Sequence, residues 1–398
     1  MNKIELLAPA GDLERLKTAV IYGADAVYIG GKQFSLRSRA SNFDVAQIKE
    51  AVEFAKGYGA KVHVTVNMIP HEEDLEGLKE YIRQLDEIGV TAVICASVSI
   101  IQTVKEVSSN LEVHLSTQQS SLNYKAVEYY QSLGVDRVVL ARELNMEQIE
   151  NISKKAVLPL EVFIHGGMCT NYSGRCTLSN YMTLRDANRG GCAHSCRWKY
   201  HLYHKGKEIS PKDALFSMSS KDLMAAEYLS RIIESGVVSL KIEGRMKSFY
   251  YIATIVKAYR NLINRYYEKN MLEESDYLEF YKELKMVENR PTAEGFYQGL
   301  PKKESHLYGI NGEGVTHDFL GKVLEYREGK ALIEVRNYFK QGDVVEIFSA
   351  HNENRRVKIE SIETVEGEAV KVCNQPMMKV WIPLSFEVKE FDIMRKAV

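Results

Sequence analysis

The sequence repeats one pattern eight times: a short, β-rich apolar run, a polar or glycine turn, and a segment with helical periodicity. The apolar runs are Ile4–Ala8, Ala26–Gly30, Lys61–Val66, Ala92–Cys95, Glu112–Leu115, Arg137–Leu140, Leu160–Ile164 and Ser239–Ile242. Eight β/α units over about 250 residues predict an α/β fold of the closed TIM type, a (β/α)8 barrel. An open doubly wound sheet shares the local pattern, although no GxGxxG motif follows a strand.

Residues at the predicted helix ends agree with this pattern. In DLERLKTAVIYG, Asp12 is a suitable N-cap and Gly23 a suitable C-terminal stop. The segment DVAQIKEAVEFAKGYG repeats the arrangement, with Asp44 and Gly57 in the corresponding places. The turn residues therefore support helices between the predicted strands.

A long gap separates the predicted seventh and eighth strands, and its first part, 165–207, is rich in cysteine and basic residues. In a barrel this insertion would leave from the C-terminal face, where the βα loops build active sites. We therefore predict a catalytic barrel over 1–250 that carries the insertion. A tyrosine-rich helical extension with a linker follows over 251–300, and alternating short strands over 301–398 predict a small all-β, barrel-like domain.

Composition and the length of the apolar runs limit the class of protein. With 45% hydrophobic and 26% charged residues, the chain can bury a large core and needs no disulfides for stability. The start, MNKIELLAPAG, has no signal-peptide apolar region, and no apolar run reaches the length of about eighteen residues that a membrane span needs. We therefore expect a soluble, cytoplasmic protein with no membrane partner.

Four of the six cysteines lie in the insertion, with the spacing Cys169-x6-Cys176-x15-Cys192-x3-Cys196. Four thiolates brought together by glycine turns form a soft-ligand site that suits zinc or an iron–sulfur cluster. Only the last pair has a spacing typical of structural zinc, so the spacing leaves both metals open. Unligated loop thiols are the third interpretation.

The net charge of −1 gives no sign of a nucleic-acid partner, but the insertion is locally basic. Between 165 and 207, seven Lys and Arg residues stand against one acid, Asp186, and five Tyr and Trp residues are interleaved. Recognition of single-stranded or loop RNA requires cations that follow phosphates and aromatics that stack on bases. The candidate RNA-binding residues are Arg175, Arg185, Arg189, Arg197, Trp198 and Lys199. A solvated loop or a site for a small anion fits the same composition.

Polar residues follow several predicted strands, and barrel geometry would bring them into one pocket. The candidate catalytic residues are His165, Glu243 and Gln118. Several guanidiniums in one pocket suit a substrate with carboxylates, because arginine binds carboxylates bidentately. The candidate substrate-binding residues are Arg37, Arg39, Asn67, Arg142 and Arg245. Taken singly, Glu243 and Arg245 also fit a structural ion pair, and His165 fits a structural histidine.

The segment EVFIHGGMCTNYSGRCTLS, residues 161–179, closely resembles the signature of the collagenase-like U-32 peptidase family. LLAPAGDLERLKTAVIYGADAVYIGG near the start, STQ at Ser116, KIEGRMK at Lys241 and NRPTAEGF at Asn289 also resemble segments of that family. No hydrolase signature accompanies them, because GxSxG is absent and the HEE sequence at His71 does not continue into HExxH.

The resemblance implies a function. The best understood members of the family are RNA hydroxylases, or a related pair for oxygen-independent ubiquinone hydroxylation, and they bind a [4Fe-4S] cluster through four cysteines. The length and the C-terminal β domain look most like the prephenate-dependent tRNA hydroxylases, which convert the wobble uridine to 5-hydroxyuridine. By this resemblance, the cluster ligands would be Cys169, Cys176, Cys192 and Cys196. Prephenate would donate the hydroxyl group, and the insertion would grip the tRNA anticodon region.

The resemblance also leaves two alternatives open. The family was named for protease activity, so a metal-dependent, collagenase-like protease is the first, with zinc in the cysteine site. The second is a non-catalytic RNA-binding subunit that works with a paralogous protein.

Overall fold

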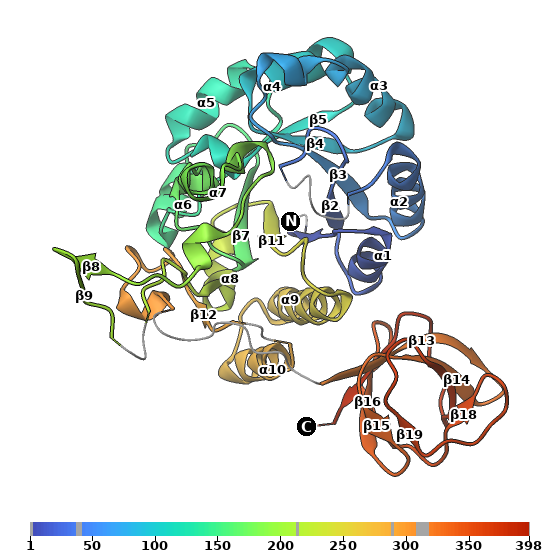
Figure 1. Cartoon of the computed structure of the whole chain (residues 1–398). Helices are drawn as coiled ribbons and strands as arrows, with labels where there is room; N and C mark the ends of the chain where they lie inside the picture. The colour runs from blue at the N-terminus through green and yellow to red at the C-terminus, as the bar shows by residue number, and fades with distance from the viewer. Residues whose placement is uncertain (1–2, 37–41, 212–214, 288–289, 308–317, 398) are drawn as a thin grey trace.

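The structure is a computed structural model that describes residues 3–36, 42–211, 215–287, 290–307 and 318–397. Eight parallel strands form a closed barrel, because the last of them pairs with both the first and the seventh (Figure 1). The strands are β1 (Glu5–Pro9), β2 (Ala26–Gly30), β3 (Lys61–Val66), β4 (Ala92–Cys95), β5 (Glu112–Leu115), β6 (Arg137–Val139), β7 (Leu160–Gly166) and β11 (Ser239–Ile242). The predicted closed barrel is confirmed.

Helices surround the barrel and bury their apolar faces against the strands (Figure 1). They are α1 (Leu13–Ile21), α2 (Val45–Gly57), α3 (Leu78–Ile88), α4 (Val98–Val107), α5 (Tyr124–Ser132), α6 (Met146–Ser153), α8 (Leu229–Glu234) and α9 (Phe249–Lys269). Asp12 and Asp44 cap α1 and α2 as predicted, and Asp44 forms a capping box with Gln47. Gly57 is not the stop of α2, because the left-handed residue after this helix is Gly59, with φ 72°.

Helix α9 corrects the predicted extension over 251–300. It packs along α1 and β1 and buries most of its residues in the barrel core, so it completes the ring of barrel helices. In the predicted extension, α10 (Glu274–Lys285) lies outside that ring, against α9 (Figure 1). No helix among the described residues is both long enough and apolar enough to span a membrane.

Two short strands that the sequence pattern did not reveal continue the sheet beside β7. β10 (Asp222–Met224) pairs antiparallel with the end of β7, where Leu223 lies opposite Gly166. β12 (Thr292–Ala293) then pairs parallel with β10. The insertion therefore begins and ends on neighbouring strands.

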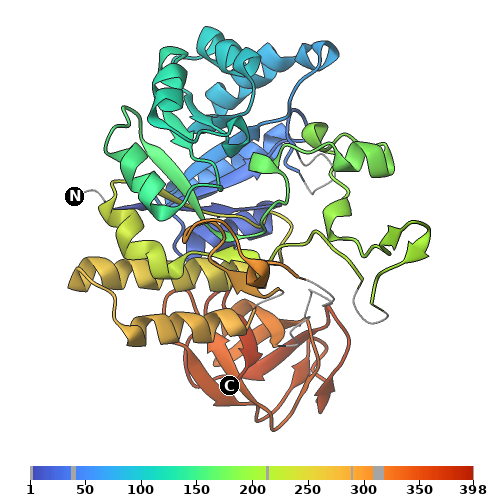
Figure 2. The same ribbon diagram turned by 90° about the vertical axis from the view of Figure 1, so that its left-hand side faces the viewer.

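The C-terminal domain is all-β and has its own apolar core. Its strands are β13 (Phe319–Arg327), β14 (Lys330–Val335), β15 (Phe339–Lys340), β16 (Val344–Phe348), β17 (Arg355–Lys358), β18 (Glu363–Thr364), β19 (Val372–Cys373), β20 (Lys379–Pro383) and β21 (Ile393–Lys396). It lies at the side of the barrel, against α9 and α10 (Figure 2). Arg395 joins the two parts, because its guanidinium donates to Glu283 of α10 at 2.8 and 3.0 Å.

Candidate functional site

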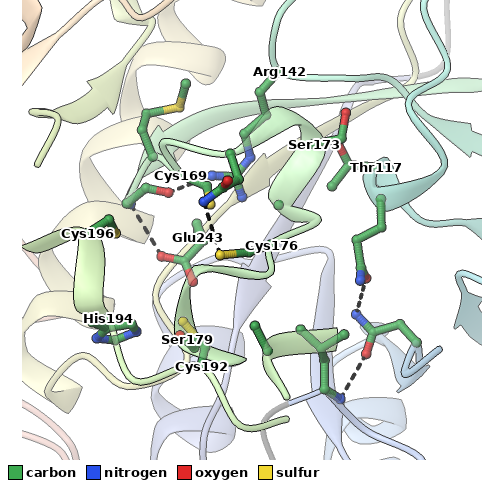
Figure 3. A pocket seen from close by; sticks show the side chains of 18 of the residues that line it. Thr117, Arg142, Cys169, Ser173, Cys176, Ser179, Cys192, His194, Cys196 and Glu243 are labelled. Atoms are coloured by element: carbon green, nitrogen blue, oxygen red, sulfur yellow. Dashed lines mark hydrogen bonds between the residues drawn. The ribbon is translucent and has the colours of Figure 1, made fainter. Parts of the chain in front are cut away.

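A cavity of about 350 Å³ lies at the C-terminal end of the barrel strands, under the insertion. Its walls combine residues from strand ends with residues of the insertion (Figure 3). The lining residues that the sequence singled out are Asn67, Gln118, Arg142, Cys169, Cys176, Cys192, Cys196, Arg197, Glu243 and Arg245. Segments far apart in the sequence therefore contribute their thiols, carboxylate and guanidiniums to one space.

The four cysteines reach the cavity from short turns of the insertion. All four are free thiols, and none is fully buried. Cys176 accepts hydrogen bonds at Sγ from Asn171 Nδ2, at 3.0 Å, and from the Leu178 N–H, at 3.3 Å. Donors aimed at sulfur stabilise the thiolate, which is the form that binds metals.

The thiols lie near one another without closing on a single point. Burial raises the pKa of Cys169 and of Cys196, and the neighbouring thiolates raise the two pKa values further. A single tetrahedral ion with metal–sulfur bonds of about 2.3 Å would require sulfur atoms about 3.8 Å apart. Among the described residues, no group of three or more His, Cys, Asp or Glu side chains is placed to hold one ion.

Two arginines enter the cavity from the barrel. Arg142 stacks on the Phe163 ring, 3.6 Å from the ring centroid, and donates to the Gly167 carbonyl at 2.5 Å. Arg245 is buried, and its guanidinium donates to the hydroxyl of Thr65 at 3.2 Å. Gly30 makes room for Arg245, because a Cβ at Gly30 would overlap the guanidinium.

Gln118 and Asn67 form a polar part of the cavity wall. Asn67 Nδ2 donates to Gln118 Oε1 at 2.9 Å, and the Ser116 hydroxyl donates to the same oxygen at 3.1 Å. These bonds fix the amide so that Gln118 Nε2, a buried donor, has no partner among the described atoms. An unpaired buried donor that lines a cavity is suited to a ligand oxygen.

Glu243 and Arg197 meet at Gly167. The Gly167 N–H donates to Glu243 Oε2 at 3.3 Å. A Cβ at Gly167 would lie 3.2 Å from that oxygen and 3.2 Å from Arg197 Nη2, so the glycine lets an acid and a base approach the backbone together. Arg197, which was predicted to bind RNA, therefore lines the cavity.

Charged residues below the cavity support its floor. Lys241 Nζ donates to Glu161 at 2.7 Å and lies 4.7 Å from the centre of the Tyr28 ring and 5.4 Å from that of Phe163. Burial acts to raise the pKa of Glu161, but Lys241 and Arg137 outweigh it and lower this pKa to about 2. The aromatic rings of Tyr28 and Phe163 therefore line the cavity, and the ion pair of Lys241 with Glu161 lies beneath them.

His165 does not line this cavity, unlike the other two predicted catalytic residues, Gln118 and Glu243. It lies on the outer side of β7, where its Nδ1 is 3.3 Å from the Tyr259 hydroxyl on α9. In the pairing with β11, Lys241 lies opposite Phe163 and Ile242 opposite His165, so a bulge at Ile164 breaks the strand alternation. Burial lowers the pKa of His165 to about 3, so the ring is neutral at neutral pH.

The predicted RNA-binding residues divide between the surface and the contacts that hold the insertion. Arg175, Trp198 and Lys199 are exposed, and Arg185 is half-buried. Arg189 instead donates to Asp74 at 2.7 Å, which ties the insertion to the loop after β3. The predicted substrate-binding residues Arg37 and Arg39 lie outside the described residues.

Sequence reasoning missed one contact that holds the insertion on the barrel. Glu143 accepts hydrogen bonds from the Ser173 N–H, at 2.6 Å, and from the Ser173 hydroxyl, at 3.2 Å. Ser173 has a left-handed backbone, with φ 51°. The only signal in the sequence was the position of Glu143 next to Arg142 at the end of the sixth strand.

Comparison with known proteins gives two family matches and several similar sequences. The profile of peptidase family U32 matches residues 11–307, and that of the peptidase family U32 C-terminal domain matches 315–395. The tRNA hydroxylation protein P1 of Bacillus subtilis is 46% identical, over 99% of this chain and 95% of that protein. The tRNA hydroxylation protein P of Escherichia coli is 32% identical, over 96% and 94%. A collagenase of Porphyromonas gingivalis is 33% identical, over 85% and 84%.

Proposed function

Because the chain belongs to peptidase family U32, we propose that it is an RNA-modifying enzyme that hydroxylates the wobble uridine of tRNA to 5-hydroxyuridine. The observation that carries this proposal is the convergence of four thiols and three arginines on one cavity at the C-terminal end of the barrel. The relatives named for tRNA hydroxylation cover almost the whole chain, which supports the same class of reaction.

A [4Fe-4S] cluster is the cofactor that we propose for the thiols, and their chemistry fits it. The ligands would be Cys169, Cys176, Cys192 and Cys196. Four thiolates that line one cavity are the donor set that such a cluster takes. When bound, such a cluster supplies redox-active, Lewis-acidic iron.

Prephenate, a dicarboxylate, is the hydroxyl donor in this proposal. Replacing the C5–H of uridine by C5–OH is a two-electron oxidation, so the donor leaves reduced by two electrons. Arg142, Arg197 and Arg245 would bind its carboxylates, because guanidinium and carboxylate form bidentate pairs. Gln118 Nε2 would donate to an oxygen of the uracil ring or the donor, and Glu243 would accept the proton lost from C5.

The test is anaerobic purification with iron, sulfide and zinc analysis, followed by nucleoside mass spectrometry of tRNA incubated with prephenate. We expect about four iron and four sulfide per chain. Cys176→Ser should lose bound iron and 5-hydroxyuridine while the barrel stays folded by circular dichroism. Cys373→Ala, in the C-terminal domain, is the matched control and should keep both.

Hydroxylation by a chain that holds no iron would refute the proposed cofactor. Stoichiometric zinc together with cleavage of gelatin would favour a protease instead, in keeping with the name of the Porphyromonas relative. Activity that appears only after a paralogous protein is added would favour a binding subunit.

A further inference from the structure

The outer end of the insertion carries apolar side chains that the fold leaves in water. Helix α7 (Leu178–Thr183) ends at Leu184, and we call Tyr181, Met182 and Leu184 the α7 tip. The exposed fractions of these residues are 85%, 45% and 93%. Large apolar residues at such exposure, gathered within four positions, mark a surface that meets a partner.

The backbone holds Leu184 outward. Leu184 adopts the left-handed conformation, with φ 54°, which bulky residues rarely do. Its N–H donates to the Asn180 carbonyl at 3.0 Å, and the Thr183 hydroxyl donates to the Ser179 carbonyl at 2.7 Å. The hydrogen bonds of the helix end therefore fix the direction of this side chain.

The α7 tip lies at the rim of the cavity. Ser179 before it and Ala187 after it both line the cavity. The cavity lies between strand ends and the insertion, so a nucleotide that enters it leaves its neighbours in the RNA at the rim. Whatever flanks a bound nucleoside must therefore pass close to the tip.

The charges around the tip favour RNA as the partner. From Cys169 to Arg189 the chain contains Arg175, Arg185 and Arg189 against one acid, Asp186, whose side chain accepts from the Asn188 N–H. Cations beside stacking surfaces match a polyanion with exposed bases, whereas an apolar protein interface would not need them.

We propose that the α7 tip stacks on the bases that flank the reacting nucleotide and occupies the space that its base leaves on turning into the cavity. This inference rests on the proposed function. Enzymes that act on a base move it out of the stack, and apolar side chains wedge between base steps in many nucleic-acid complexes. Leu184 is the wedge, Tyr181 is the stacking platform, and Arg175 and Arg185 contact the adjoining phosphates.

The test uses the full chain with its metal and an RNA stem-loop that carries 2-aminopurine beside the target uridine. Binding to the unaltered protein should raise the fluorescence, because the neighbouring base loses its stacking partner. Leu184→Ala and Tyr181→Ala should each bind about 5- to 100-fold more weakly and give a smaller rise. Leu278→Ala is the matched control, because Leu278 is 62% exposed on α10, and it should behave as the unaltered protein.

Three results would overturn the inference. If the tip variants bind the RNA and raise its fluorescence as the unaltered protein does, and still hydroxylate it, the wedge role is refuted and the proposed function stands. A chain that neither binds nor hydroxylates the stem-loop would remove both. Tip variants that turn a dimer into a monomer in sedimentation, with unchanged RNA binding, would make the tip a protein interface.

Discussion

Single atoms decide which groups reach the cavity. Gly30 has no Cβ, and Arg245 occupies the space where one would stand. His165 follows Phe163 by two residues, yet one bulged residue between them sends the two side chains to opposite sides of the strand. The missing Cβ of Gly30 and the one-residue bulge in β7 therefore determine which side chains line the cavity.

Gly30→Ala should displace Arg245 from the cavity. The loss of a charge-assisted contact worth about 1.5–3 kcal/mol predicts a KM for the anionic substrate roughly 10- to 100-fold higher. Gly57→Ala is the control, since a Cβ at Gly57 meets nothing within 4 Å, and it should leave KM unchanged. Equal KM values for the two variants would mean that Arg245 does not bind the substrate.

His165 should act on stability and not on catalysis. Its pKa is about 3 in the folded chain and about 6.5 when unfolded, so its contribution is present above pH 6.5 and is lost as the pH falls toward 3. His165→Asn should keep activity within a few-fold. Between pH 6 and pH 4, its unfolding free energy in urea should fall less steeply, by about 1.4 kcal/mol per pH unit. Parallel slopes for variant and parent would contradict this.

At the scale of elements, the insertion is held on the barrel by a few polar contacts. Arg189 ties it to Asp74, and Ser173 ties it to Glu143. Left-handed Ser173, Leu184 and His194 bend it sharply at three places, at a cost of about 1–2 kcal/mol each. These three residues therefore lower the stability of the insertion while they set the path of its backbone around the cavity.

Arg189→Ala should loosen the insertion. Since a partly exposed ion pair contributes up to about 1 kcal/mol, limited proteolysis between 169 and 197 should become about two- to fivefold faster. Arg175→Ala removes an exposed arginine from the same segment and should leave the cleavage rate unchanged. A faster rate in both variants would show that the effect is not specific to the contact with Asp74.

The strands and the barrel could be predicted because each strand is an apolar run with its own turn residues. The strands β10 and β12 could not, since two or three residues show no alternation. The assignment of α9 to the barrel could not be predicted either, because the periodicity of a helix does not indicate which element the helix packs against. Asn67, Gln118, Arg142, Glu243 and Arg245 line the cavity because strand ends converge in a barrel. His165 also lies at a strand end, but the bulge in β7 turns its side chain away from the cavity.

The whole molecule joins a barrel to a β domain through buried charges and rings. Arg395 is 2% exposed and lies between Glu283 of α10 and Glu346 of β16. Tyr22, directly after α1, stacks on Phe348 of the β domain, with ring centroids 5.5 Å apart. The two parts therefore share a continuous interface.

Arg395→Ala should weaken this interface. Removing the guanidinium leaves two largely buried carboxylates without their partner, which costs about 3–5 kcal/mol. Urea unfolding should show the loss in midpoint, whereas Arg327→Ala, at a 63% exposed side chain, should change stability by less than about 0.5 kcal/mol. A small effect at Arg395 would mean that the other contacts between the two parts, such as the ion pair of Lys322 with Glu14, hold them together without it.

The pairing of β10 with β7 has a consequence for how this architecture diversifies. Since Gly166 and Leu223 are ladder neighbours, the chain leaves the barrel and returns to it at one point. Closure entropy grows only slowly with the length of such a loop, by about 0.6 kcal/mol per doubling. The segment can therefore be shortened, extended or exchanged as a cassette while the barrel keeps its register, so that one scaffold can serve many different substrates.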